Sequence, residues 1–241
     1  MSLYVVIPAY NEAENIEAVI NAWSKILEIT YGGGGYNLLV IDDGSKDNTF
    51  KIIQDCAEKN SHIIPLTKKN SGHGPTLLYG YDYALKHGAD YIFQTDSDGQ
   101  TLPEEFISFW ELRNEYDAIL GKRPDRQDGA SRKFIELVLR LILRLIFGVK
   151  VPDANCPFRL MKADLLRKYL YRLPRDFNIP NVMLTTYFTY FHENITFKSI
   201  TFRARQGGKN FINLRKIFKI GIKAVKDFYN FRRDLKNETQ N

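Results

Sequence analysis

The sequence predicts an α/β fold in which a mostly parallel sheet is flanked by helices. In the first half of the 241 residues, short apolar runs alternate with stretches of helical periodicity. This alternation is typical of β-α-β units, whose crossover helices cover both faces of a parallel sheet. Polar clusters follow three of the apolar runs. Because ligands of such sheets bind outside the carboxyl ends of the strands, we expect these clusters to share one functional edge.

Five strands are expected in this first half. Each is a short run of apolar residues, bounded by glycine, proline or other turn-forming residues. They span Leu3–Ile7, Asn37–Ile41, His62–Leu66, Asp90–Thr95 and Asp117–Gly121.

Helices are expected between these strands. Asn11 and Glu14 fit an N-cap and its reciprocal partner, which opens a helix to about Ile29. Proline is favoured in the first turn of a helix, so a later helix is expected to begin at Pro103. The remaining two are expected from about Asp47 and over Gly74–His87.

The second half contains a strongly apolar helical segment, Phe134–Phe147. Its charged residues Glu136, Arg140 and Arg144 are four residues apart and share one helical face. The rest of the helix is apolar almost all round. Such a helix is buried in the core, paired with another helix or pressed into a lipid surface, and the sequence leaves these alternatives open.

The C-terminus is predicted to form a basic amphipathic helix. We expect one domain over residues 1–210 and a basic helix or tail over residues 211–241. Leu214, Ile217 and Phe218 begin a series of apolar residues at helical spacing, and lysines and arginines mostly occupy the other positions. Two roles fit this helix equally: binding an acidic membrane surface, or packing on the domain with a solvated basic face.

The charge balance favours an anionic partner. The formal net charge is +6 and the sequence pI is about 9.1, which fits phosphates, a nucleotide or an acidic membrane. The N-terminus lacks a signal-peptide pattern, and no run of about 18 apolar residues predicts a transmembrane helix. We therefore expect a cytoplasmic protein that could bind peripherally to the inner face of the membrane.

The segment QTDSDGQ places Asp96 and Asp98 at the end of the fourth expected strand. Two nearby carboxylates repel each other, and a divalent cation relieves the repulsion. Oxygen ligands suit Mg²⁺ or Mn²⁺, whose coordination is usually completed by water and substrate phosphates. Gln100 could add a carbonyl oxygen. A polar turn is the simpler alternative, and the position at the ligand edge favours metal binding.

The segment DDGS follows the second expected strand. Asp42 and Asp43 could accept hydrogen bonds from a base or a ribose, and Gly44 with Ser45 permits a tight turn. A simple strand-to-helix turn explains Gly44 well, but it does not explain two adjacent acids.

The motifs VVIPAYNEAENI, VIDDGSKDNT and TDSDGQ together resemble family 2 glycosyltransferases with the GT-A fold. Later segments, GKRP, DANCPFRLMKADLL and FRARQGGKN, are similar to those of polyprenyl-phosphate sugar synthases of the dolichyl-phosphate mannose synthase type. The resemblance spans nearly the whole chain in the same order. It implies a GT-A, Rossmann-like α/β fold. The sequence departs from the usual D-A-D pattern at Ser97, and Asn155-Cys156-Pro157 replaces a small Ser/Thr-Gly pair.

The resemblance also implies site residues. Catalysis would involve Asp96, Asp98 and Arg123, and the metal would bind to Asp98 and Gln100. Arg132 and Asp153 would contact the acceptor or its phosphate. The nucleotide-sugar would contact Pro8, Tyr10, Glu12, Asp42, Asp43, Asp96, Ser97, Arg123, Arg203 and Lys209.

The implied reaction is metal-dependent, inverting transfer of one sugar from a UDP- or GDP-sugar to a polyprenyl phosphate. A phosphate monoester is already an anion at neutral pH, so this acceptor needs no general base. His73 and Asp153 are the candidates for a base, and a structural role explains each of them better.

Three alternatives remain. The acceptor could be a hydroxyl of a surface glycan. A haloacid-dehalogenase-like phosphatase has a D-x-D-G-T loop, but Gln100 interrupts that pattern and the loop would normally follow the first strand. A non-catalytic module that binds membrane or nucleic acid would leave the acidic clusters unexplained, so we expect no nucleic-acid partner.

Overall fold

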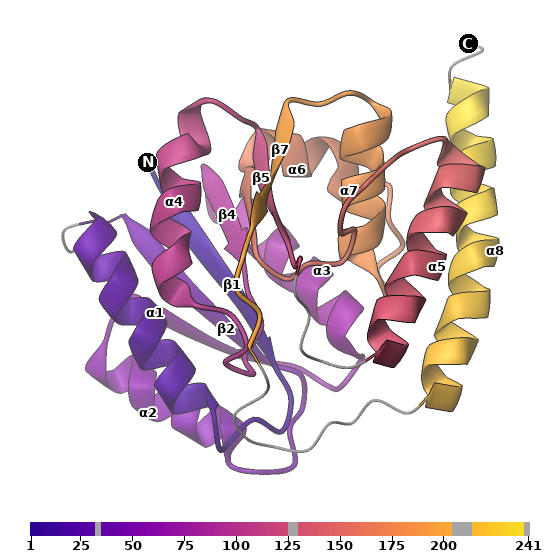
Figure 1. Cartoon of the computed structure of the whole chain (residues 1–241). Coiled ribbons are helices and arrows are strands. Elements are labelled where there is room, and N and C mark those ends of the chain that lie inside the picture. Colours follow the sequence, from indigo (N-terminus) through magenta and orange to yellow (C-terminus); the bar gives the residue numbers. More distant parts are fainter. Residues whose placement is uncertain (32–34, 125–129, 204–213, 239–241) are drawn as a thin grey trace.

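The computed structural model describes residues 1–31, 35–124, 130–203 and 214–238, and in these residues one seven-stranded sheet organises the chain (Figure 1). The strand order is β3-β2-β1-β4-β6-β5-β7. The strands are β1 (Leu3–Ala9), β2 (Tyr36–Asp42), β3 (Ile63–Thr67), β4 (Tyr91–Gln94), β5 (Ala118–Lys122), β6 (Arg159–Lys162) and β7 (Ile195–Ser199).

Strand β6 is antiparallel to its two neighbours, β4 and β5, while the other pairs are parallel. Residue Gln94, at the end of β4, is therefore opposite Arg159, at the start of β6. The loop that leads into β6 thus reaches the edge at which the parallel strands end. Segments that are far apart in the sequence meet there.

Helices cover both faces of the sheet (Figure 1). One face carries α1, α2 and α4, and the other carries α3, α6 and α7, while α5 and α8 lie side by side at one end of the molecule. The α-helices are α1 (Ile16–Tyr31), α2 (Thr49–Lys59), α3 (His73–Lys86), α4 (Phe106–Glu111), α5 (Ala130–Phe147), α6 (Ala163–Leu170), α7 (Pro180–Tyr190) and α8 (Leu214–Glu238). Short 3₁₀ helices cover Pro103–Glu105 and Leu112–Asn114.

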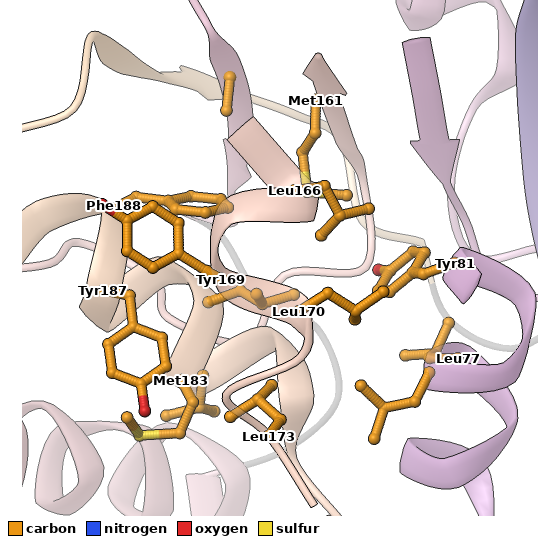
Figure 2. Close-up of a cluster of buried hydrophobic side chains, with 14 of the residues drawn as sticks. Leu77, Tyr81, Met161, Leu166, Tyr169, Leu170, Leu173, Met183, Tyr187 and Phe188 are labelled. Carbon is orange, nitrogen blue, oxygen red and sulfur yellow. The ribbon is translucent and has the colours of Figure 1, made fainter. Parts of the chain in front are cut away.

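Two hydrophobic clusters result, one on each face of the sheet. Alternate residues of β1 supply both: Val5 and Ile7 pack under α1, and Val6 packs under α3. Figure 2 shows the cluster on the face that α3, α6 and α7 cover, in which Tyr81 of α3 faces Leu170 of α6. Burial of these side chains stabilises the fold by roughly 25 cal/mol per Å² of apolar area removed from water.

The predicted α/β fold is confirmed, and the five predicted strands correspond to β1–β5, with ends that differ by one or two residues. The predicted N-cap at Asn11 is wrong. Asn11 has a φ of 54°, in the left-handed region, and its side-chain Oδ1 accepts a hydrogen bond from the backbone N–H of Lys46 at 2.8 Å. Helix α1 begins at Ile16, because the chain first makes a turn in which Glu12 O accepts hydrogen bonds from Asn15 and Ile16.

Helix α8 packs on the domain through residues 224–235. Ala224, Phe228 and Leu235 are buried, and the rings of Phe147 and Phe228 lie 6.1 Å apart. The ring of Phe231 is 5.4 Å from that of Phe177. The division of the chain at residue 210 stays a prediction, because residues 204–213 lie outside the described ranges.

Helix α5 is only partly covered. Leu143 and Phe147 are buried, but Leu137, Leu141 and Leu145 remain 60%, 55% and 76% exposed. The prediction of a helix is confirmed, and it extends to Ala130. Within the described part of the chain, no helix combines the length and apolar character needed to cross a membrane.

Candidate active site

The three acidic clusters lie at one edge of the sheet, as predicted. Parallel pairing places Ala9 beside Asp42, and Val6 beside Gln94, so the segments that follow β1, β2 and β4 leave the sheet on the same side. Strand β5 is antiparallel to β6, as β4 is, so β5 also runs parallel to β4 and ends at this edge at Lys122, directly before Arg123. This edge is the candidate site.

The Asp42–Asp43 corner is held by hydrogen bonds from the protein itself. The carboxylate of Asp42 accepts from the backbone N–H of Ser45 at 3.1 Å and from the hydroxyl of Thr67 at 2.8 Å. Asp43 is paired with Lys68 and accepts from the backbone N–H groups of Ser71 and Gly72 at 2.9 and 2.8 Å. Both acids are buried. Their carboxylates therefore build the corner that faces the site.

Gly44 is required in this corner. Its φ is +68°, and a Cβ at this position would lie 2.8 Å from the backbone nitrogen of Asn70. Only glycine adopts this conformation without strain and permits this close approach.

The segment after β1 is fastened to the same corner. The backbone N–H of Asn11 donates to Ser45 Oγ at 2.9 Å, and that of Glu12 donates to Thr49 Oγ1 at 2.8 Å. The carboxylate of Glu12 is buried and accepts from the side-chain amide of Asn15 at 2.9 Å. Of the other residues predicted here, Pro8 is buried and Tyr10 is half-buried.

The turn after β4 carries Asp96 and Asp98. Gly99 allows the tight turn with a φ of 71°, and the backbone N–H of Gln100 donates to Asp98 Oδ1 at 3.2 Å. Ser97 is buried between the two acids in the sequence. Within the turn, the hydroxyls of Thr95 and Thr101 are 2.9 Å apart.

Asp96 is held more loosely than the acids of the first corner. Its Oδ1 accepts from Gln94 Nε2 at 3.3 Å and lies 3.7 Å from His73 Nε2. Burial raises the pKa of Asp96 above its ordinary value, although the charges of His73 and Arg123 act in the opposite direction. A raised carboxylate pKa means that a positive charge brought beside Asp96 would be favourable.

The donor set fits a hard divalent cation. Asp96 and Asp98 offer carboxylate oxygens, and Gln100 could add an amide oxygen. The Gln100 side chain is buried, and its Nε2 donates to the backbone oxygen of Arg203 at 2.8 Å, so the amide oxygen is the atom left for a cation. In the residues that the structure describes, no group of three His, Cys, Asp or Glu side chains could hold a metal by itself. A cation here would need further oxygens from water or a phosphate.

Arg123 and Asp153, predicted for separate roles, form a buried ion pair. Arg123 Nε and Nη2 donate to the two carboxylate oxygens of Asp153 at 2.7 and 2.9 Å. Burial acts to lower the pKa of Arg123, but the hydrogen bonds and charge of Asp153 outweigh it and raise that pKa. The guanidinium also lies 5.0 Å from the ring of Phe202.

The other candidate for a base, His73, lies beside Asp96, and its side chain is 53% exposed.

The remaining predicted residues are distributed as follows. Arg203 is exposed, and its backbone N–H donates to the carbonyl of Gln100 at 2.8 Å, which brings it to the site. Arg132 lies on α5, but its side chain is outside the described part of the structure, as is the whole of Lys209.

Sequence reasoning missed a set of buried polar side chains behind Asp96. Gln94, Arg159, Asn181 and Tyr81 are all buried and hydrogen-bonded together. The sequence feature that could have indicated this set is Gln94, a polar residue that ends an apolar strand two positions before Asp96. Its partners could not be found this way, since they come from α3, β6 and α7.

Comparison with known proteins agrees with this geometry. Residues 4–170, more than half of the chain, match the sequence model of the family described as Glycosyl transferase family 2. The chain belongs to this family. The haloacid-dehalogenase-like phosphatase and the non-catalytic binding module are therefore set aside.

Curated relatives in this family include the undecaprenyl-phosphate 4-deoxy-4-formamido-L-arabinose transferases. The chain is 30% identical to the one from Enterobacter sp. (strain 638) and 28% identical to the one from Yersinia pestis (strain Pestoides F), in each case over 179 residues. Each match covers 73% of this chain and 53% of the relative. The chain thus spans about half the length of these relatives.

Solved structures confirm the GT-A fold. Glucosyl-3-phosphoglycerate synthase from Mycobacterium tuberculosis, in complex with Mn²⁺, UDP-glucose and phosphoglyceric acid, superposes with a TM-score of 0.66. That match is 18% identical and covers 96% of this chain and 79% of the synthase. S. aureus TarS 1-349 in complex with UDP gives a TM-score of 0.58 at 19% identity, covering 91% and 63%.

Proposed function

We propose that this protein transfers one sugar from a nucleotide-diphospho-sugar to a polyprenyl phosphate. The main observation behind this proposal is that Asp96, Asp98 and the Arg123–Asp153 pair lie at the same edge of the sheet. This is the edge at which ligands bind in α/β folds, and the chain belongs to glycosyltransferase family 2. The acceptor is supported by the curated relatives, which are named as undecaprenyl-phosphate sugar transferases. The donor is supported by the neighbours solved with UDP and UDP-glucose.

The donor would lie along the edge from β2 to β4. Pro8, Tyr10 and Glu12 would contact the nucleoside together with the corner that Asp42 and Asp43 build. The diphosphate would then reach Asp96 and Asp98. This order follows from the sheet, because β1 lies between β2 and β4.

A divalent cation, Mg²⁺ or Mn²⁺, would be held by Asp98 and Gln100 with Asp96 beside it, and it would supply positive charge for the leaving diphosphate. The neighbouring synthase structure contains Mn²⁺ with UDP-glucose. Arg203 would add a further positive charge, as would Lys209 for a donor or acceptor phosphate. Cationic groups placed where charge develops lower the barrier by stabilising the transition state.

In the transfer, an acceptor phosphate oxygen attacks the anomeric carbon on the face opposite the diphosphate. The new C–O bond forms while the bond to the diphosphate breaks, so the configuration inverts, and the nucleoside diphosphate leaves with the bonding electrons. The acceptor phosphate is already anionic at neutral pH and needs no base. Asp153 then serves to hold Arg123 near the edge, where Arg132 would meet the acceptor phosphate.

A lipid acceptor implies work at a membrane surface, and α5 offers a face for it. Leu137, Leu141 and Leu145 form an exposed apolar stripe, and Arg140 and Arg144 are exposed beside it. Apolar side chains flanked by arginines suit the interface of an anionic bilayer. Cosedimentation with phosphatidylglycerol vesicles is expected to decrease strongly for Leu141→Glu, and a wild-type level of binding by that variant would count against this face.

The function is tested with purified protein, Mn²⁺ and a panel of UDP- and GDP-sugars, with undecaprenyl phosphate in detergent as acceptor. Lipid-linked sugar should form with one donor and disappear when EDTA is added. Transfer to a glycan hydroxyl, with none to the lipid phosphate, would instead establish the glycan as the acceptor. If no nucleotide-sugar raises the melting temperature, the donor site is refuted, since ligands that bind only the folded state stabilise it.

A further inference from the structure

A continuous chain of buried polar side chains runs from the core to Asp96. It begins at Arg159 in β6, which is fully buried and donates from Nη1 to the backbone oxygen of Asn181 at 3.3 Å. Asn181 Nδ2 donates to Gln94 Oε1 at 2.9 Å, and Gln94 Nε2 donates to Asp96 Oδ1 at 3.3 Å. The chain therefore links β6, α7 and β4 and ends at the candidate donor site.

The surroundings determine which way the Gln94 amide faces. Its oxygen receives the Asn181 N–H, and the hydroxyl of Tyr81 lies 3.3 Å from the same oxygen and 3.2 Å from Asn181 Oδ1. With Asn181 Nδ2 donating to its oxygen on the core side, Gln94 presents its NH₂ group to Asp96. Reversing the amide would place its oxygen against the carboxylate and its NH₂ against the Asn181 N–H, which is unfavourable at both ends.

Asn181 is itself held on two sides. It is the second residue of α7, and its backbone oxygen accepts from both Arg159 and the hydroxyl of Thr185, the latter at 2.8 Å. Arg159 also donates from Nη2 to the backbone oxygen of Cys156 at 3.1 Å. That contact fixes the loop whose Asp153 pairs with Arg123. Arg159 thus supports two parts of the candidate site: the side chains that lead to Asp96 and the loop that carries Asp153.

We propose that Gln94 and Asn181 are positioning residues that hold the Asp96 carboxylate in place for the donor diphosphate and its cation. This inference rests on the proposed function, because it takes Asp96 to act on the donor. A hydrogen bond to a carboxylate fixes its orientation, and outer partners of this kind commonly change metal affinity or activity by about 10-fold to 100-fold.

The test compares Gln94→Leu, Gln94→Glu and Asn181→Asp with a matched control, Thr186→Val. Thr186 is also fully buried on α7, but its hydroxyl donates along its own helix, to Val182 O at 2.7 Å. Each protein is assayed for kcat, for KM toward the donor and for the Mn²⁺ concentration that gives half-maximal rate. Melting temperatures are recorded in parallel.

Gln94→Leu should lower kcat/KM by about 10-fold to 100-fold and raise the Mn²⁺ requirement, while Thr186→Val should match the wild type. Gln94→Glu should be at least as impaired, since it places an oxygen against Asp96. Asn181→Asp keeps the size of the side chain but replaces the amide that donates to Gln94 with an ionisable carboxyl. It should therefore impair the enzyme even where its melting temperature is unchanged.

Wild-type kinetics and an unchanged Mn²⁺ requirement in a folded Gln94→Glu or Asn181→Asp protein would overturn the inference. Should Gln94→Leu fail to fold, these two polar variants carry the test. Should the wild type bind donor with Mn²⁺ yet transfer nothing to undecaprenyl phosphate, the acceptor proposal fails separately. The Mn²⁺-dependent donor affinity of the same variants then decides the inference, with a 10-fold loss in its favour and no loss against it.

Discussion

The two acidic corners of the site are built in opposite ways. At the first, Asp42 and Asp43 are buried and their oxygens accept hydrogen bonds from Ser45, Thr67, Ser71, Gly72 and the paired Lys68. At the second, Asp96 is 27% exposed and has a 3.3 Å hydrogen bond from Gln94 and a 3.7 Å contact with His73. Similar residue types thus stabilise the fold at one corner and keep a carboxylate available for a ligand at the other.

This difference agrees with the pKa of Asp96, which burial raises above its ordinary value. At the first corner, the carboxylate oxygens already accept hydrogen bonds from the protein itself. An acid that lacks full compensation costs stability until a cation arrives, and such residues cluster at functional sites. Variants of the two corners should therefore separate activity from stability.

The largest expected effect is on activity at the second corner. Asp98→Ala should reduce sugar transfer by about 10²-fold to 10³-fold, because it removes a proposed oxygen ligand of the cation that would stabilise the diphosphate charge. Initial rates at saturating donor and Mn²⁺ measure the loss. Asp55→Ala, which removes an exposed carboxylate from α2, is the matched control and should be fully active. Near-wild-type activity of Asp98→Ala would remove this residue from the catalytic group.

The next largest effect is on stability at the first corner. Asp43→Ala should lower the free energy of unfolding by about 3 kcal/mol, because it leaves Lys68 and two backbone N–H groups without their acceptor. Urea unfolding measures this difference. Asp164→Ala, at an ion pair whose carboxylate is 94% exposed, should change it little. Equal effects of the two substitutions would show that the Asp43 contacts contribute no special stability.

The smallest expected effect is on the pH dependence of stability at the second corner. In Asp96→Asn, measured without divalent cation at pH 7, the melting temperature should rise, by about 2–4 °C for each kcal/mol gained. A folded-state pKa above the ordinary value of 3.8 means that ionisation destabilises the fold at higher pH. The gain should shrink as the pH is lowered and the wild-type carboxyl binds its proton. A lower melting temperature for this variant at pH 7 would contradict the raised pKa.

The sequence predicted the first half of the fold well because each of its strands and helices has a local sequence pattern of its own. Strands β1 to β4 alternate with helices, and the ends of each predicted strand lie within two residues of the strand that forms. Even here the predicted N-cap at Asn11 was wrong. The sequence pattern cannot reveal that the Asn11 side chain accepts a hydrogen bond from the N–H of Lys46.

The second half could not be predicted in the same way. Strand β6 is only four residues long and begins with Arg159, a residue type that rarely enters a core. Helix α7 lacks the amphipathic pattern of a surface helix because most of its side chains are buried. The role of Asp153 also depended on a partner 30 residues away, Arg123.

Because β6 lies between β4 and β5 in the sheet, the candidate site can form only late during synthesis of the chain. Strands β1 to β4 can pair as soon as they leave the ribosome, but the open edge of β4 must wait for Arg159–Lys162. Until then Trp23 and Phe93 lack the ring of Phe158, which lies 6.0 and 4.7 Å from theirs in the finished protein. A nascent chain that stalls before this point exposes a strand edge and aromatic surface to aggregation. The candidate site thus cannot be completed before Arg159–Lys162 has been translated.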